Sequence, residues 1–126
     1  MKKLFLLFSH TLTTAQLEDA KDTLGVETFV ELPEGLQELW SNVPAELECL
    51  SDYLQPIRDY MIEHIEVDDV ALVQGDFGAT CSMASFVKSL GGVAVYATTK
   101  RNVEEIQDGD TIVKRSVFQH VIFRQY

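Results

Sequence analysis

The chain has 126 residues, of which 46% are hydrophobic, and a formal net charge of −10 at pH 7. This length and composition predict one globular domain over residues 1–126, and the excess of acidic residues argues against general binding to DNA or RNA backbones. The apolar stretch after Lys3 is too short for a signal peptide or a membrane span, and the two cysteines lack metal-ligand spacing. The sequence therefore predicts a cytoplasmic protein with reduced thiols and no membrane partner.

Hydrophobic periodicity predicts strands that alternate with helices. Thr13 and Gln16 have the spacing of a capping box before the first helix, which Gly25 ends. Pro56 lies inside a long amphipathic pattern and predicts a kink or a break there. In chain order the predicted elements are strand 3–8, helix 13–24, strand 27–32, helix 33–40, helix 44–65, strand 70–73, helix 82–90 and strand 93–97.

The C-terminal part of the chain follows a different pattern. Asp108-Gly109 is typical of a tight hairpin turn, with predicted strands at residues 103–106 and 111–123 on either side. Both faces of the second strand carry apolar residues, which indicates packing on a second subunit. The whole order predicts an α/β fold, in which helices flank a mainly parallel sheet that has a C-terminal antiparallel hairpin extension.

Three predicted loops leave the carboxyl ends of strands and so share the edge at which sheets of this kind bind ligands. They cover residues 9–12, 75–80 and 98–101. Gly75 and Gly78 form a turn into a helix N-terminus, which attracts anions through its unpaired N–H groups. The alternative is that both glycines only make a tight strand-to-helix connection. In the third loop, Lys100 and Arg101 add positive charge.

The polar residues of these loops have two interpretations each. His10 is either a general acid-base or phosphate-binding group, or a loop residue bonded to backbone. Arg101 either holds a phosphate through two hydrogen bonds or forms a surface ion pair with Glu104 or Glu105. Asp76 repels anions, so it either caps the helix or binds a ribose hydroxyl.

Several common sites are absent from the sequence. It has no Gly-x-Gly-x-x-Gly and no Gly-Lys-Ser/Thr motif, which argues against hydride transfer and against NTP hydrolysis. No cluster of His, Cys and carboxylates has metal-ligand spacing, and no serine lies in a nucleophile elbow. Neither a metal nor a cofactor is predicted.

Three segments resemble a known family. Residues 3–13 (KLFLLFSHTLT), 74–80 (QGDFGAT) and 96–101 (YATTKR) are similar to the small Csx-type accessory proteins of type III CRISPR systems. The similarity covers nearly the whole chain. It implies a Rossmann-like fold, usually dimeric, that binds a cyclic oligoadenylate second messenger. Several such proteins are ring nucleases that open the messenger, and others bind it without cutting.

The resemblance implies a ring nuclease, with cyclic tetra-adenylate as the expected ligand and no metal. In this assignment a ribose 2′-hydroxyl attacks the adjacent phosphate, His10 moves a proton or positions the hydroxyl, and Arg101 stabilises the transition state. The protein is expected to be a homodimer. The first alternative is a non-catalytic module that sequesters the same messenger, and the second is an unrelated phosphohydrolase that needs a metal. The expected ligand-binding residues are Ser9, Gly75, Asp76, Phe77, Gly78, Ala79, Thr80, Thr98, Thr99 and Lys100.

Overall fold

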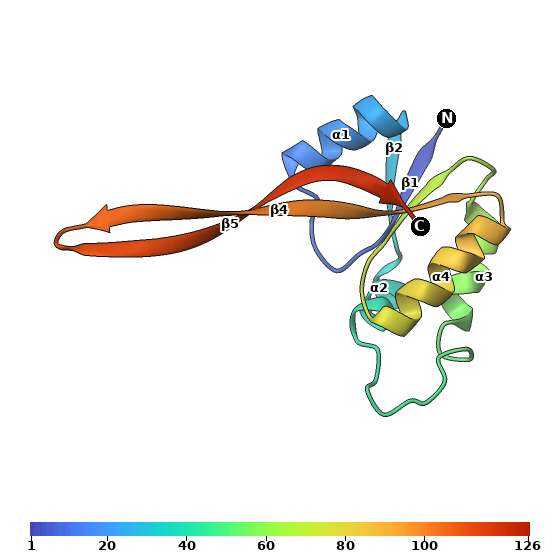
Figure 1. Cartoon of the computed structure of the whole chain (residues 1–126). Helices are drawn as coiled ribbons and strands as arrows, with labels where there is room; N and C mark the ends of the chain where they lie inside the picture. Colours follow the sequence, from blue (N-terminus) through green and yellow to red (C-terminus); the bar gives the residue numbers. More distant parts are fainter.

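The computed structural model describes residues 1–126 and is built on one five-stranded sheet in the order β2-β1-β3-β4-β5 (Figure 1). The first four strands in that order are parallel, and β5 is antiparallel to β4. The predicted fold class is therefore confirmed. The strands are β1 (Lys3–Leu7), β2 (Thr28–Glu31), β3 (Val70–Val73), β4 (Val93–Asp108) and β5 (Thr111–Gln125).

Helices cover both faces of the sheet. Helix α1 (Thr14–Leu24) lies on one face, and α2 (Glu34–Ser41), α3 (Gln55–His64) and α4 (Phe77–Ser89) lie on the other (Figure 1). The central strands are therefore buried on both faces. This explains why residues 70–73 are all apolar and do not alternate with polar residues. The capping box of α1 forms as predicted, because the Thr13 hydroxyl accepts from Gln16 N and the Gln16 amide accepts from Thr13 N.

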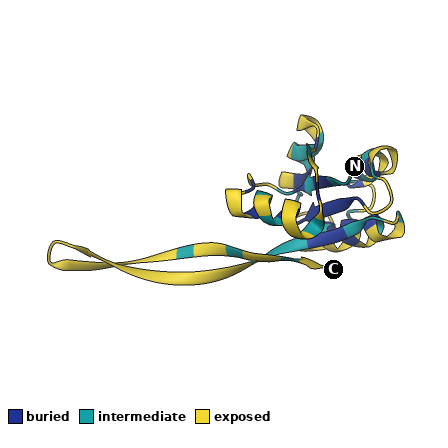
Figure 2. Ribbon diagram, turned by 90° about the horizontal axis from the view of Figure 1, so that it is seen from above, coloured by how far each residue is buried: buried dark blue, intermediate teal, exposed yellow.

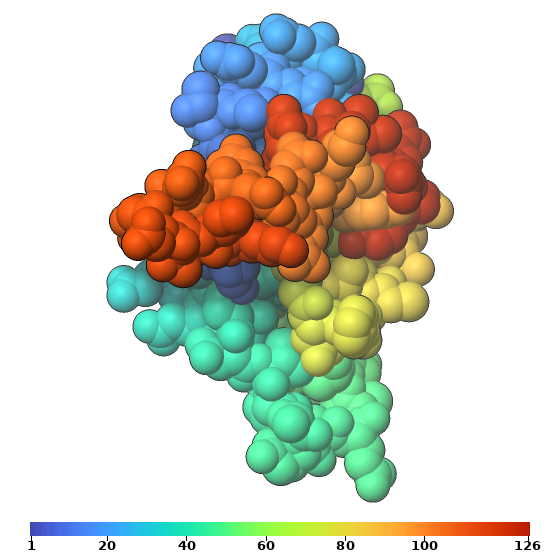
Figure 3. All heavy atoms as spheres, turned by 60° about the vertical axis from the view of Figure 1, so that its left-hand side comes forward, coloured from blue at the N-terminus to red at the C-terminus, as the bar shows by residue number.

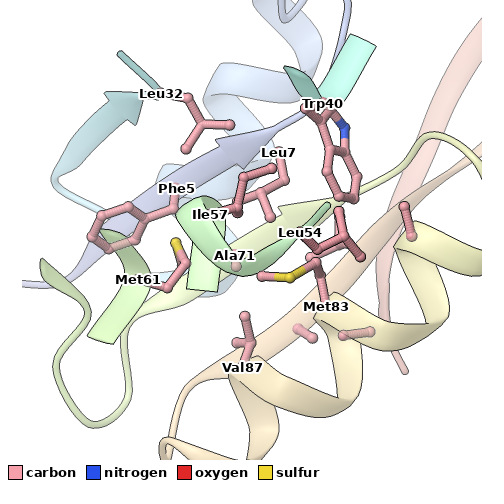
Figure 4. Packing of buried hydrophobic residues seen from close by; sticks show 14 residues of the cluster. Phe5, Leu7, Leu32, Trp40, Leu54, Ile57, Met61, Ala71, Met83 and Val87 are labelled. Carbon is pink, nitrogen blue, oxygen red and sulfur yellow. The ribbon is translucent and has the colours of Figure 1, made fainter. Parts of the chain in front are cut away.

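The larger core cluster joins α2, α3 and α4 to the sheet (Figure 4). Trp40 of α2 is its largest side chain and is 2% exposed. Phe5 and Leu7 enter this cluster from β1, while Leu4 and Leu6, which alternate with them in the chain, pack in the smaller cluster beneath α1. This alternation is the two-residue period of a strand that is covered on both faces.

The predicted long helix over residues 44–65 is wrong. The helix is only α3, and the residues before it form turns. Pro56 stands in the first turn of α3, where its missing N–H costs nothing, so the helical pattern breaks at this point and does not kink; the break is one of the two outcomes predicted for Pro56. Leu50 and Leu54 still reach the core from the turns, so their helical spacing was misleading. Helix α4 in turn begins at Phe77, five residues earlier than predicted.

The two C-terminal strands form a hairpin that extends far beyond the rest of the sheet (Figures 1 and 2). The separate strands predicted at residues 93–97 and 103–106 are one continuous strand, β4, so Thr98–Arg101 is not a loop. An irregularity in the pairing lies between Ala97 and Thr99. We call Lys100–Gln119 the arm; its tip is the predicted turn at Gly109, which has a φ of 65°.

Candidate functional site

The carboxyl ends of the parallel strands form one edge of the sheet, which Figure 3 views with the arm pointing forward. Strands β1 and β3 are neighbours at its centre. The chain leaves β1 towards β2 on one side and leaves β3 towards β4 on the other. The loop after β1 and the turn after β3 therefore diverge here, and this switch point is where open α/β sheets bind their ligands.

The loop after β1 borders a cavity of about 630 Å³ between that loop, α1, β2 and α2. Ser9 and His10 line it together with Glu31 and Gln37. Gln37 of α2 holds the loop in place, because its amide donates to Phe8 O at 3.0 Å. The His10 side chain is exposed and packs edge-on against the Phe8 ring, so it has room to meet a ligand.

The turn after β3 is held by Trp40 and Asp76. A Cβ on Gly75 would lie 3.0 Å from Trp40 Nε1, so any other residue here would press on the indole and force it to shift. Gly78 has only ordinary spacing around it and lies in the first turn of α4. The Asp76 carboxylate accepts from Ala79 N at 3.0 Å and caps α4. Of the two interpretations of Asp76, the structure shows the cap.

Gln74 joins four elements at this edge, although its place in the sequence did not single it out. Its side-chain oxygen accepts from Ala97 N at 2.9 Å, and its backbone oxygen accepts from Trp40 Nε1 at 3.1 Å. Its own N–H donates to Leu7 O at 3.0 Å. Gln74 thus connects β1, β3, β4 and α2. In the sequence, Gln74 appeared only as a polar residue directly after a buried strand and as the first residue of the segment 74–80.

A second cavity at the edge, of about 430 Å³, lies beside the start of α4. Tyr96 and Tyr126 line it with their ring centroids 4.9 Å apart, and the Tyr126 hydroxyl donates to Val73 O. Burial, and then the neighbouring Tyr96, raise the pKa of Tyr126 above its usual value of 10.0. Thr80 also lines this cavity, and its hydroxyl oxygen is buried without a partner. Neither tyrosine was among the predicted site residues, although Tyr96 begins the segment 96–101.

The remaining predicted ligand residues lie on β4. The Thr98 hydroxyl is bonded to the backbone of Ile122. Arg101 donates to Ser116 Oγ from Nε at 3.1 Å and from Nη2 at 2.9 Å, so the ion pair with Glu104 or Glu105 is not formed. Ala97 lies beside Gln74, the residue that follows β3 at the carboxyl edge. Arg101 is four residues further along β4 and therefore stands about 13 Å beyond that edge.

The structure thus brings residues 9–10 and 75–80 to one edge without placing them in one cavity, and it holds residues 98–101 on β4 beyond that edge. Ser9 and His10 line the first cavity; Gly75, Phe77 and Thr80 line the second. Asp76 and Gly78 line a third, of about 560 Å³, beneath residues 43–51. Residues 98–101 line none of the three, and Ala79 is buried in the core. No group of three His, Cys, Asp or Glu side chains is arranged to hold a metal ion, and no helix has the length and apolar character needed to cross a membrane.

The parallel strand order, the helices on both faces and the switch point between β1 and β3 define a Rossmann-like α/β protein. The model of the family described as "Uncharacterized protein MJ1673 family" matches residues 2–124. "Uncharacterized protein MJ1673" of Methanocaldococcus jannaschii is 43% identical over 126 residues, covering 100% of this chain and 98% of that protein. The chain therefore belongs to the MJ1673 family. No solved structure matches it.

Proposed function

We propose that the protein binds a cyclic oligoadenylate at the carboxyl edge of its sheet and opens the ring, as an accessory ring nuclease of a type III CRISPR system. The observation that carries the proposal is the position of Ser9-His10 and of the turn into α4 on the two neighbouring strands of the switch point. A histidine and a helix N-terminus on adjacent strand ends suit a phosphodiester that must be both held and attacked. The exposed cysteines, Cys49 and Cys81, accord with a cytoplasmic location.

Ring opening needs no reactant other than the ligand. The ribose 2′-oxygen forms a bond to the adjacent phosphorus, and the bond from phosphorus to the 5′-oxygen breaks. The proton leaves the 2′-hydroxyl, and a proton is supplied to the departing 5′-oxygen. The products are a 2′,3′-cyclic phosphate and a 5′-hydroxyl. The protein contributes in-line positioning, proton transfer and stabilisation of the charge on phosphorus-bound oxygens.

His10 is assigned the proton transfer because it is exposed in the first cavity. Backbone N–H groups at the start of α4 are assigned to phosphate oxygens, in competition with the Asp76 carboxylate. Strand β4 supplies the remaining assigned residues, which are Thr98, Thr99, Lys100 and Arg101. Of these, Lys100 and Arg101 provide the positive charge. We assign the protein two copies per ring, since a symmetric ring presents equivalent phosphates to both.

Sequestration without cleavage is the second candidate, and one observation favours it. His10 and Arg101 share no cavity within one chain, so a single chain does not assemble both assigned catalytic groups. A module that only binds the ring would tolerate this separation. A cleaving enzyme needs a second copy, or movement of the arm, to bring them together.

The test is incubation of the purified protein with radiolabelled cyclic tri-, tetra- and hexa-adenylate in the presence of EDTA. Multiple turnovers of one ring, ending in a 2′,3′-cyclic phosphate, support the ring nuclease, and protection of the ring at stoichiometric protein supports sequestration. His10→Ala and Arg101→Ala are expected to lower the rate about 100-fold or more. His64→Ala on α3 and Arg115→Ala further along the arm are the matched controls and should retain activity. Absence of both binding and cleavage overturns the proposal.

A further inference from the structure

Nearly all of the arm is exposed (Figure 2), and it carries exposed apolar side chains on both of its faces. Residues that lie directly opposite each other in two paired strands have their side chains on the same face of the hairpin. The register of β4 and β5 therefore shows which apolar residues share a face. Val103, Ile112 and Phe118 lie on one face; Ile106, Val113 and Val117 lie on the other. Phe118 is 68% exposed and Ile112 is 64% exposed. A hairpin with one apolar face could pack that face against the rest of its own chain. A hairpin with two exposed apolar faces needs another molecule to cover both of them.

An uncovered arm would be poorly stable. A two-stranded hairpin in water is marginal unless a third strand or another surface covers it. Both arm strands also keep one edge unpaired, because β3 ends at Val73 and β5 is the last strand of the sheet. The two strands are nevertheless paired regularly, from the opposed residues Lys100 and Gln119 at the base of the arm to its tip. This combination is typical of a segment that is completed by a partner.

The base of the arm is fixed in direction. His120 Nε2 lies 2.7 Å from Asp19 Oδ2 of α1, with the histidine side chain 5% exposed. His120 also packs on Phe123, with ring centroids 4.7 Å apart. The arm therefore projects in a defined direction, outward past the carboxyl edge of the sheet (Figures 1 and 3). Whatever covers the arm must then sit in front of the candidate site.

We propose that the partner is a second copy of this chain, and that the two arms clasp the two bodies with their carboxyl edges face to face. Each arm is about 30 Å long and about 10 Å wide, so both faces of two arms supply about 1,200 Å² to the interface. A stable interface buries about 1,200–2,000 Å² in total, so the arms alone reach the lower end of that range. A two-fold axis also closes the assembly, leaving no arm uncovered.

Charge at the base of the arm is complementary to charge on the carboxyl edge. The arm holds four basic and four acidic residues and is neutral, so the entire net charge of −10 resides on the rest of the chain. Lys114 and Arg115 stand opposite Glu105 and Glu104 across the hairpin, whereas Lys100 stands opposite Gln119 and Arg101 opposite Phe118. Two uncompensated cations at the base thus face the partner's edge, which carries carboxylates at Glu31, Glu34 and Glu38.

This arrangement brings Lys100 and Arg101 into the space between the two edges. It would supply the proposed site with the positive charge that a single chain holds about 13 Å away from its own rim. The dimer itself does not depend on the proposed activity, because the apolar faces and the charges exist without any ligand. The two proposals can therefore fail separately.

The experiment measures molar mass in solution without nucleotide, by light scattering after size exclusion. The wild-type chain should have twice the monomer mass of 14.2 kDa. A variant in which Asn-Gly replaces residues 102–117 should be monomeric, and Val103→Ser combined with Phe118→Ser should raise the dimer dissociation constant at least 100-fold. Circular dichroism checks that each variant is folded. Ile62→Ser is the matched control: it removes an apolar side chain 55% exposed on α3, away from the arm, and should remain dimeric.

Hydrogen exchange provides a second reading that does not require a variant. Arm amides of the wild-type chain should be protected at high protein concentration and should exchange faster on dilution. A monomeric wild-type chain, a dimer that persists without the arm, or an open assembly larger than two copies overturns the proposal. Binding of the monomer to anionic phospholipid vesicles or to RNA through the arm overturns it as well, in favour of that partner.

Discussion

His120 Nε2 lies 2.7 Å from Asp19 Oδ2, and this pair joins two elements that are 101 residues apart in the chain. Asp19 is on α1 and His120 stands where β5 leaves the arm for the sheet. Asp19 is also bonded to Thr23, since its Oδ1 accepts from the Thr23 hydroxyl at 2.8 Å. The aspartate is therefore oriented from its own helix, and through it the helix controls the direction of the arm.

Asp19→Ala is expected to loosen the arm. It removes a hydrogen bond to a nearly buried histidine, which should lower the free energy of unfolding by about 1–3 kcal/mol. The arm amides near Gln119 should exchange with deuterium faster, while those of β1 should not. Glu18→Ala, at the neighbouring exposed position, is the control and should change stability by less than about 0.5 kcal/mol. Equal exchange in both variants would contradict the anchoring role.

Gly75→Ala is expected to destabilise the carboxyl edge. The new methyl group would press on the buried Trp40 indole, from which it would be 3.0 Å away, and overpacking of this kind costs about 1–3 kcal/mol. Urea denaturation measures the difference. Gly35→Ala on α2 has open space around its Cβ, so it should be neutral or stabilise by up to about 1 kcal/mol. A neutral Gly75→Ala would show that the close approach is not tight.

Substitutions of Asp76 separate its capping role from its charge. Asp76→Asn keeps an oxygen for Ala79 N and should leave stability nearly unchanged, whereas Asp76→Ala loses the cap and about 1 kcal/mol. The asparagine also removes a negative charge beside the start of α4, so cyclic tetra-adenylate should bind about two- to five-fold more tightly. Isothermal titration measures this affinity. Weaker binding to Asp76→Asn would instead indicate that the carboxylate contacts a ribose hydroxyl.

Tyr126 is expected to make the fold sensitive to alkaline pH. Because the pKa of Tyr126 is raised in the folded state, the folded chain holds the phenolic proton more firmly than the unfolded chain. The resulting stability is fully present below pH 10.0 and is lost as the pH rises above it. In Tyr126→Phe the melting temperature should therefore decline less steeply between pH 8 and pH 11 than in the wild-type chain. The variant should also be less stable at pH 8, because it loses the hydrogen bond to Val73 O. Parallel declines in the two proteins would contradict this.

The order of strands and helices could be predicted because each rests on local chemistry. Residues 70–73 are apolar throughout, Thr13 and Gln16 form their capping box, and Gly109 turns the hairpin. The helix over residues 44–65 was wrong because apolar spacing of three and four also arises when turns place leucines against a core. Pro56 predicted either a kink or a break, and the sequence alone could not decide between them, because proline also suits the first turn of a new helix.

The candidate site could be predicted only to the level of its edge. Parallel strands fix which loops meet, so Ser9, His10 and Gly75 were placed together correctly on one edge. The sequence could not show that β4 continues as a strand through Arg101, because Thr98-Thr99-Lys100-Arg101 suits a loop as well as an exposed strand. Tyr126 was missed because its partner, Val73 O, lies 53 residues away along the chain.

Trp40 is the only tryptophan in the chain, and its indole lies directly against Gly75. Indole emission shifts in wavelength and intensity when its hydrogen bond or its polar surroundings change. The chain therefore carries its own optical reporter at the switch point, which needs no label and is not obscured by a second tryptophan. A ligand that enters beside Gly75, or an edge that closes against another copy, should be visible as a change in intrinsic fluorescence.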